Sequence, residues 1–97
     1  MKPVVLRPAA ERDIQEIHDW YETRRQGLGD EFLEEVEPTL TLIELYPQAF
    51  PALRARIRRA VILRFPYNVF FRETDQEIHV IALLHGGVTH ASGVSRI

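Results

Sequence analysis

The sequence predicts an α+β domain in which an N-terminal strand and a helical hairpin precede a three-stranded antiparallel meander. The helices are expected to pack on one face of a single sheet. Apolar residues first recur at helical spacing and, after Pro51, at every second position. Glycine and proline separate these segments. A chain of 97 residues, 45% of them hydrophobic and 27% charged, fits one small globular domain over residues 1–97.

Residues 3–7 are β-branched and apolar in part, which predicts a short strand. Pro8 then opens a helix, because the first position of a helix has no use for the N–H that proline lacks. One face of this helix carries the apolar residues Ala10, Ile14, Ile17 and Tyr21. Gly27 and Gly29 break the chain and form the loop of an antiparallel hairpin.

The second helix is predicted from Asp30, acting as its N-cap, to Leu45. Its buried stripe consists of Phe32, Val36, Leu40 and Ile43. Pro38 lies inside this helix and removes one backbone hydrogen bond. Because the stripe keeps its register across Pro38, the helix is expected to kink there without breaking.

The second half predicts three strands, at residues 57–64, 67–73 and 77–84. Phe65-Pro66 marks the first turn and residues 74–76 the second, and connections this short predict antiparallel pairing. The middle strand is apolar at both parities, so both sheet faces are expected to be partly covered. Residues 86–97 are expected to form a loosely attached tail with a short strand at residues 94–97.

Charge is distributed unevenly along the chain. Residues 1–44 contain 11 acidic and 5 basic side chains, whereas residues 45–97 contain 3 acidic and 7 basic ones. Six arginines occupy residues 54–72, which include no Asp or Glu: Arg54, Arg56, Arg58, Arg59, Arg64 and Arg72. Two explanations fit this uneven distribution of charge. Either the basic half binds an anionic partner, or the acidic and basic halves pair within the fold.

Several segments resemble the RelE/ParE superfamily of bacterial toxins, and the resemblance covers residues 3–86. Residues 7–14 (RPAAERDI) resemble the opening of the family. Residues 58–72, with RR, RFPY and VFFR in order, resemble its paired strands, and residues 78–86 (IHVIALLHG) its last strand. Each segment is short, so the resemblance depends on their order and spacing along the chain. Within the superfamily, the segments resemble the ParE-like branch, the plasmid-stabilisation toxins, more than the RelE-like branch.

The resemblance implies a toxin of a type II toxin–antitoxin module that inhibits bacterial growth and is neutralised by a cognate antitoxin. ParE-like toxins poison DNA gyrase, whereas RelE-like toxins cut messenger RNA on the ribosome. The pattern departs after Gly86, where Gly87, Val88 and Thr89 replace the arginines of many ParE-like chains. No Tyr follows Tyr67, so the aromatic hydroxyl of RelE-like ribonucleases is also missing. Binding to a protein target is therefore favoured over catalysis, and a non-toxic relative that only binds an antitoxin is a further alternative.

If the chain were a metal-independent endoribonuclease, Arg58, Arg64 and His85 would be the catalytic candidates. Guanidinium groups match phosphate oxygens, and histidine titrates near neutrality. The simpler interpretation of His85, which we favour, is that it ends a strand and hydrogen-bonds the backbone. No metal site is predicted, because His79 and His85 stand about 20 Å apart along one strand.

The predicted partner-binding residues are Arg56, Arg58, Arg59, Arg64, Arg72 and Trp20. Arg72, beside Glu73, is the arginine expected to be structural. Trp20 lies at the edge of the first helix's apolar stripe, where core packing is favoured over a role as an interface anchor.

The absence of cysteine excludes disulfides and thiolate chemistry and fits a reducing compartment. No signal peptide or membrane-spanning run is visible, so a cytoplasmic protein without membrane contact is expected. No cofactor is predicted. Expected partners are the antitoxin and either DNA gyrase or the ribosome with its messenger RNA. A homodimer through the hairpin or an open sheet edge, or a toxin–antitoxin hetero-oligomer, are the assemblies considered.

Overall fold

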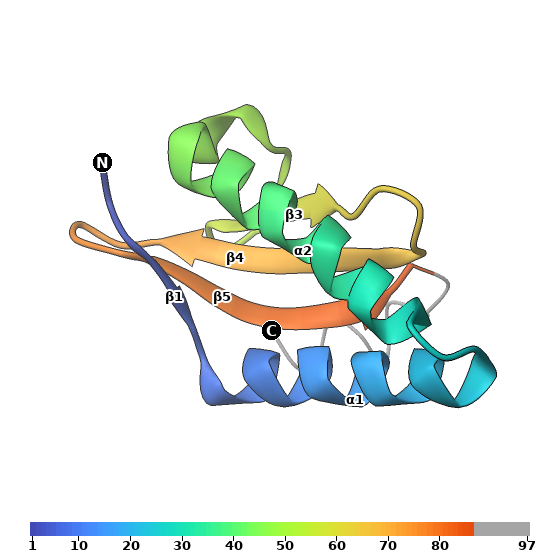
Figure 1. Cartoon of the computed structure of the whole chain (residues 1–97). Coiled ribbons are helices and arrows are strands. Elements are labelled where there is room, and N and C mark those ends of the chain that lie inside the picture. The colour runs from blue at the N-terminus through green and yellow to red at the C-terminus, as the bar shows by residue number, and fades with distance from the viewer. Residues whose placement is uncertain (87–97) are drawn as a thin grey trace.

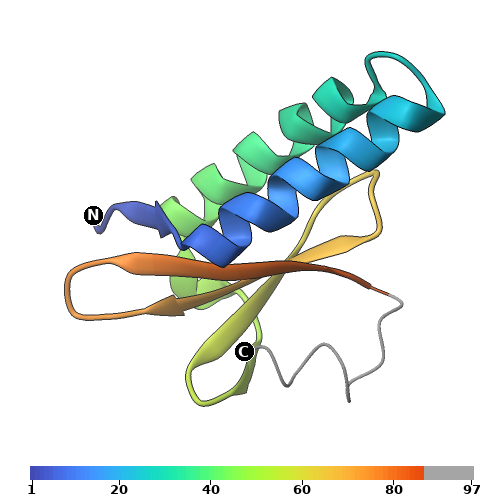
Figure 2. The same cartoon turned by 90° about the horizontal axis from the view of Figure 1, so that it is seen from below.

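The computed structural model describes residues 1–86 as two layers, a five-stranded sheet and a pair of helices on one of its faces (Figures 1 and 2). The helices are α1 (Pro8–Arg24) and α2 (Leu28–Leu45), followed by the short 3-10 helix η1 (Pro47–Ala49). The strands are β1 (Val4–Leu6), β2 (Ala52–Arg54), β3 (Ile57–Val61), β4 (Tyr67–Glu73) and β5 (Ile78–His85). In this part of the chain, neither helix is long and apolar enough to cross a membrane.

The strand order across the sheet is β1-β5-β4-β3-β2. The meander of β3, β4 and β5 is antiparallel, as predicted. The sheet as a whole is mixed, because β1 joins β5 in parallel, with Val4 opposite Ile78 and Leu6 opposite Val80. The prediction of a three-stranded antiparallel sheet is therefore wrong in strand number and partly in direction. The helical hairpin supplies the long connection that a parallel pair needs.

Strand β2 is the element that the sequence analysis missed. Its three residues are all exposed, so it carries no alternation of buried and exposed positions. It pairs with β3 through a tight turn in which Ala55 and Arg56 both have positive φ. The expected loop of residues 46–51 also contains η1.

The first predicted strand of the meander is too long. Strand β3 ends at Val61, and the chain then turns through Arg64, whose φ of 71° is incompatible with an extended strand. Strand β4 has the predicted bounds, and β5 begins one residue later than predicted. The predicted tail and terminal strand lie outside the described residues from residue 87 onward.

The hairpin is tighter than predicted, because α2 begins at Leu28 and not at Asp30. Gly27, with φ 88°, is the N-cap residue, and Asp30 lies in the first turn. Gly29 is a point of close approach between the helices, since an added Cβ would lie 2.5 Å from the backbone oxygen of His18. Helix α2 continues through Pro38 without a break.

The core lies between the helices and the sheet. Its largest fully buried side chains are Phe32, Phe71, Ile43, Ile62, Ile78, Val69 and Val80. Burial of a phenylalanine such as Phe32 contributes about 2–3 kcal/mol. Strand β4 also places Phe70 on the opposite face, where it is 8% exposed. The apolar character of β4 at both parities therefore corresponds to burial on both faces.

Candidate partner-binding surface

Arg58 lies on the helix side of the sheet, because it stands opposite the core residue Phe71 in the β3–β4 register. Its side chain is half-buried, and Nη1 donates a hydrogen bond of 2.6 Å to the backbone oxygen of Phe50. That contact ties β3 to the segment after η1. Arg58 is therefore engaged in holding the fold together.

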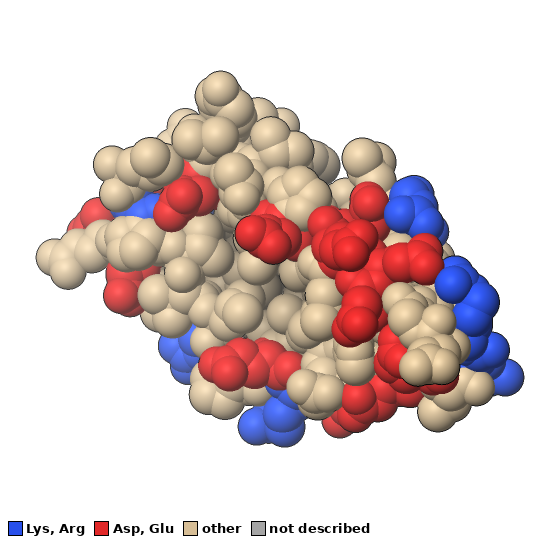
Figure 3. All heavy atoms as spheres, viewed as in Figure 1, with Lys and Arg blue, Asp and Glu red and all other residues tan. Residues whose placement is uncertain are grey.

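Arg64 lies in the turn between β3 and β4 and reaches the outer surface of α2. Its Nη2 is 3.1 Å from Oε1 of Glu31, and its Nη1 is 3.4 Å from Oε1 of Glu35. The carboxylate of Glu31 raises the pKa of Arg64. In turn, hydrogen bonds from Arg25 and, to a smaller extent, from Arg64 lower the pKa of Glu31. Here the acidic and basic halves of the chain do pair within the fold. Figure 3 shows further Asp and Glu side chains gathered over the two helices.

Arg59 and Arg72 point away from the helices, onto what we call the open face of the sheet. Arg59 stands opposite Phe70, and its buried Nε has no hydrogen-bond partner among the described residues. Arg72 is exposed, stands opposite Ile57, and has no hydrogen bond or ion pair with any residue of the described chain. These two cations are not neutralised by the described fold.

Arg72 was expected to be structural beside Glu73, but among the described residues it makes no hydrogen bond or ion pair with that carboxylate. Neighbouring residues of a strand point to opposite faces. The carboxylate of Glu73 binds the Nζ of Lys2 at 2.7 Å, which lowers the pKa of Glu73.

Arg56 occupies the left-handed turn between β2 and β3, with φ 65°, and is exposed. It lines a hollow of about 340 Å³ near Lys2, Arg58 and Glu73. Arg56 therefore belongs to the end of the sheet where β2 and β3 join, away from the middle of the open face.

Trp20 is half exposed, at 49%, so the favoured prediction of core packing is wrong. Its neighbour Tyr21, which was predicted on the apolar stripe, is partly buried and packs against the core cluster. The guanidinium carbon of Arg24 lies 4.3 Å from the centre of the Trp20 ring, and this contact holds the indole against α1. The role of Trp20 as an interface anchor stays a prediction.

His85 ends β5, as predicted, and its ring lies 5.3 Å from that of Tyr67. The three catalytic candidates thus have separate surroundings. Arg58 binds the Phe50 carbonyl, Arg64 binds two carboxylates of α2, and His85 packs against an aromatic ring. The described residues do not present these three groups as one cluster around a single phosphate.

Two further residues, Arg7 and His79, lie at the open face, although neither was predicted to belong to a partner-binding surface. Arg7 follows β1, and its Nη1 lies 3.5 Å from Nδ1 of His79. The Nε2 of His79 is 3.0 Å from a carboxylate oxygen of Glu77. The parallel pairing of β1 with β5 brings these residues together over a separation of 72 positions. No local pattern signals a pairing over that distance.

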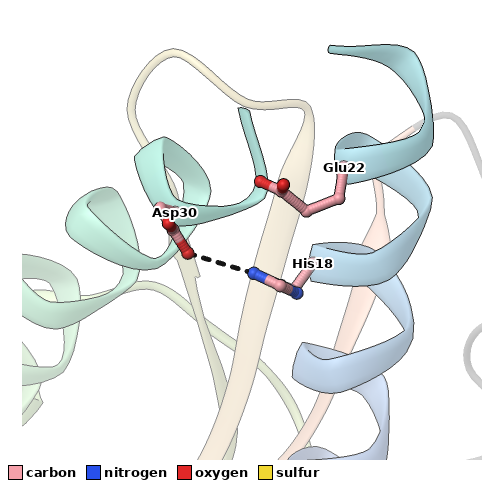
Figure 4. Close-up of side chains that lie close together, drawn as sticks. All are labelled: His18, Glu22 and Asp30. Atoms are coloured by element: carbon pink, nitrogen blue, oxygen red, sulfur yellow. Dashed lines mark hydrogen bonds and ion pairs between the residues drawn. The ribbon is translucent and has the colours of Figure 1, made fainter. Parts of the chain in front are cut away.

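The hairpin contains a compact polar cluster of His18, Glu22 and Asp30 (Figure 4). One ligand atom from each residue lies within 4.8 Å of the others, so these are the side chains of the described chain that could together approach a metal ion. Each is already engaged, however. Glu22 accepts hydrogen bonds from the N–H groups of Gly27 and Gly29, at 3.1 and 2.7 Å, and so caps α2.

His18 joins the two helices in this cluster. Its Nδ1 lies 3.0 Å from Asp19 and its Nε2 lies 3.1 Å from Asp30, and these two carboxylates raise the pKa of His18. The bonds from Gly27 and Gly29 lower the pKa of Glu22. An imidazolium between carboxylates explains the cluster without a metal ion, and we assign it to hairpin stability.

The family model described as ParE toxin of type II toxin-antitoxin system, parDE, matches residues 4–88. A solved structure titled "Chromosomal ParDE TA system from P. aeruginosa" has a similar fold, with a TM-score of 0.77 and 16% sequence identity over 88% of this chain and 95% of that one. No curated protein sequence matches. With the family match spanning nearly all of the described fold, the chain belongs to the ParE toxin family of type II toxin–antitoxin systems.

Proposed function

We propose that this protein is the toxin of a type II module, that an antitoxin encoded beside it neutralises it, and that it inhibits growth by binding a protein target such as DNA gyrase. The observation that carries the proposal is the open face, where Arg59 and Arg72 have no acidic partner in the described chain. Uncompensated cations on an exposed sheet favour rapid association with an acidic protein.

Exposed apolar side chains also support binding to a protein. At the end of α2, Leu42, Leu45 and Tyr46 are exposed by 46–60% of their surface. Near the edge formed by β2 and β3, Leu53, Val61 and Leu63 are exposed as well. Large exposed apolar residues beside charged groups are typical of protein interfaces. Trp20 is a further anchor under this proposal, since an exposed tryptophan often contributes strongly to an interface.

The arrangement of the basic residues favours binding over RNA cleavage. Metal-independent cleavage needs a base, an acid and cations around one phosphate. Arg58 and Arg64 are occupied by contacts within the fold, and His85 packs on Tyr67. The alternative function is a ribosome-dependent endoribonuclease, and the test must distinguish it from a toxin that binds a protein target.

The test is induced expression in a bacterial host, with and without the neighbouring small open reading frame. Growth arrest that the neighbour relieves supports the toxin–antitoxin assignment. Purified protein is then added to a gyrase supercoiling assay and to a translation reaction in which messenger RNA ends are mapped. Inhibited supercoiling with intact RNA is the expected result.

Cleaved messenger RNA with unaffected gyrase would contradict the proposed target. In that case His85→Ala should abolish cleavage while the circular dichroism spectrum stays unchanged. Absence of arrest, with the neighbour's product still bound, would instead identify a non-toxic relative that retains antitoxin binding.

A further inference from the structure

A hollow of about 370 Å³ opens on the sheet where β1 passes into α1. Its lining residues are Arg7, Pro8, Ala9, Ile57, Arg72, His79 and Ile81. Two guanidinium-bearing side chains and one imidazole therefore border a single hollow, with apolar atoms between them.

The sheet register explains how these residues meet. Ile57 stands opposite Arg72 in the β3–β4 pair, and Arg72 stands opposite His79 in the β4–β5 pair. These three side chains form a row across three neighbouring strands. Arg7 closes the end of the row, because its backbone N–H donates to the oxygen of Val80 at 3.0 Å. The hollow is thus built on rigid, paired backbone.

The hollow carries more positive than negative charge. At one side of the hollow, the guanidinium of Arg7 contacts one ring nitrogen of His79, and the carboxylate of Glu77 contacts the other. This side therefore contributes one positive guanidinium and one negative carboxylate. Arg72 adds a second guanidinium that has no partner in the described chain. The first turn of α1, with Ala9 in the lining, adds the positive end of the helix dipole. An anionic group is the ligand that this arrangement fits.

The surroundings favour a peptide carboxylate over a nucleic acid. Single-stranded nucleic acids are bound by cations together with exposed aromatic rings on which bases stack. The aromatic residue that β4 turns onto the open face, Phe70, is only 8% exposed. The exposed aromatics of the described chain, Trp20 and Tyr46, lie on or at the end of the helices. Apolar walls from Pro8, Ile57 and Ile81 suit the methylene stem of Asp or Glu.

We infer that this hollow receives the carboxylate of an acidic side chain from the antitoxin, with Arg7 and Arg72 as its two ligands. The inference rests on the proposed function, because it takes the antitoxin as the partner. Two guanidiniums that converge on a carboxylate provide short, charge-assisted hydrogen bonds. The antitoxin residue is then fixed in register on the sheet.

The test measures the dissociation constant between the full-length chain and the product of the neighbouring reading frame. Arg7→Gln and Arg72→Gln should each weaken binding about tenfold or more, since each removes one charged ligand. Arg12→Gln removes an exposed cation of α1 that does not line the hollow, and should change binding less than about threefold. Circular dichroism checks that all three variants fold.

The acidic side chain is found by replacing each Asp and Glu of the antitoxin with Asn or Gln. One of these replacements should weaken binding by about the same factor as Arg72→Gln. Combined with Arg72→Gln, it should weaken binding little more than Arg72→Gln does alone. Equal affinity of the Arg7 and Arg72 variants and the wild type would overturn the inference while leaving the proposed function intact. Failure of the wild type to bind the neighbour's product would overturn both. A labelled single-stranded RNA that binds the wild type and not Arg72→Gln would overturn the choice of a carboxylate.

Discussion

Arginines on the two sides of the sheet meet different surroundings. On the helix side, Arg58 donates to a backbone carbonyl and Arg64 pairs with two carboxylates of α2. On the open face, Arg59 has a buried Nε without a partner, and Arg72 has no partner in the described chain. Burying a charged group without a partner costs stability. We therefore expect the helix side to serve stability and the open face to serve binding.

The largest expected effect tests the helix side. In Gly29→Ala, the added Cβ would lie 2.5 Å from the backbone oxygen of His18, and α1 and α2 must separate. The free energy of unfolding should fall by roughly 3 kcal/mol, as for overpacking of a tight contact. Urea denaturation measures it.

Gly86→Ala is the matched control for that substitution. Its added Cβ would have ordinary contacts, the nearest at 3.5 Å from Pro66, so stability should change little. Equal losses for the two variants would show that the hairpin contact is not what limits stability.

The open face should respond in the opposite direction. Arg59→Met keeps most of the apolar stem and removes the buried Nε that lacks a partner. The free energy of unfolding should therefore rise by about 1 kcal/mol, while binding to the antitoxin weakens. A loss of stability in thermal unfolding would show that the Arg59 side chain supports the fold, and the contrast between the two faces would then fail.

A smaller loss is expected from Arg64→Gln, which removes the ion pairs to Glu31 and Glu35. The Arg64 side chain is 58% exposed, so solvent screens both pairs. The unfolding midpoint should fall less than in Gly29→Ala, and the difference from the wild type should shrink in 1 M NaCl. Arg12→Gln serves as the comparison for general loss of charge. A difference independent of salt would argue for packing of the Arg64 stem instead.

The smallest effect concerns pH and His18. Its folded-state pKa is raised by Asp19 and Asp30 from the ordinary value of 6.5. The stabilisation is therefore complete below about pH 6.5 and is lost as pH rises through the raised folded value. His18→Gln should be less stable than the wild type near pH 5.5, and the gap should narrow near pH 9. A gap that widens with pH in urea titrations would contradict the imidazolium assignment.

Local patterns in the sequence predict most of the elements but not their long-range pairing. The helical stripes of α1 and α2 and the alternation in β4 depend on neighbours a few residues apart, and their bounds were close to those observed. Strand β2 has no alternation because all three of its residues are exposed. The start of α2 was misplaced because Glu22, a residue of α1, caps it from across the hairpin.

The candidate site was predicted in part. The sequence identified Arg59 and Arg72 among the basic residues, but it could not show which arginines the helices would neutralise. That distinction depends on Glu31 and Glu35 lying beside the turn at Arg64. Arg7 was overlooked because it lies in the acidic half of the chain, and only the parallel pairing of β1 with β5 brings it to His79.

The parallel pairing of β1 with β5 also sets an order of events during synthesis. Residues 4–6 leave the ribosome well before their partners at residues 78–80, because the two segments are far apart in the sequence. The helical hairpin has its own local contacts and can form early, whereas closing a loop of this length comes late. Arg7 and Arg72 then share one hollow only after β5 has been made. A nascent chain therefore cannot display the basic hollow while β5 is still inside the ribosome.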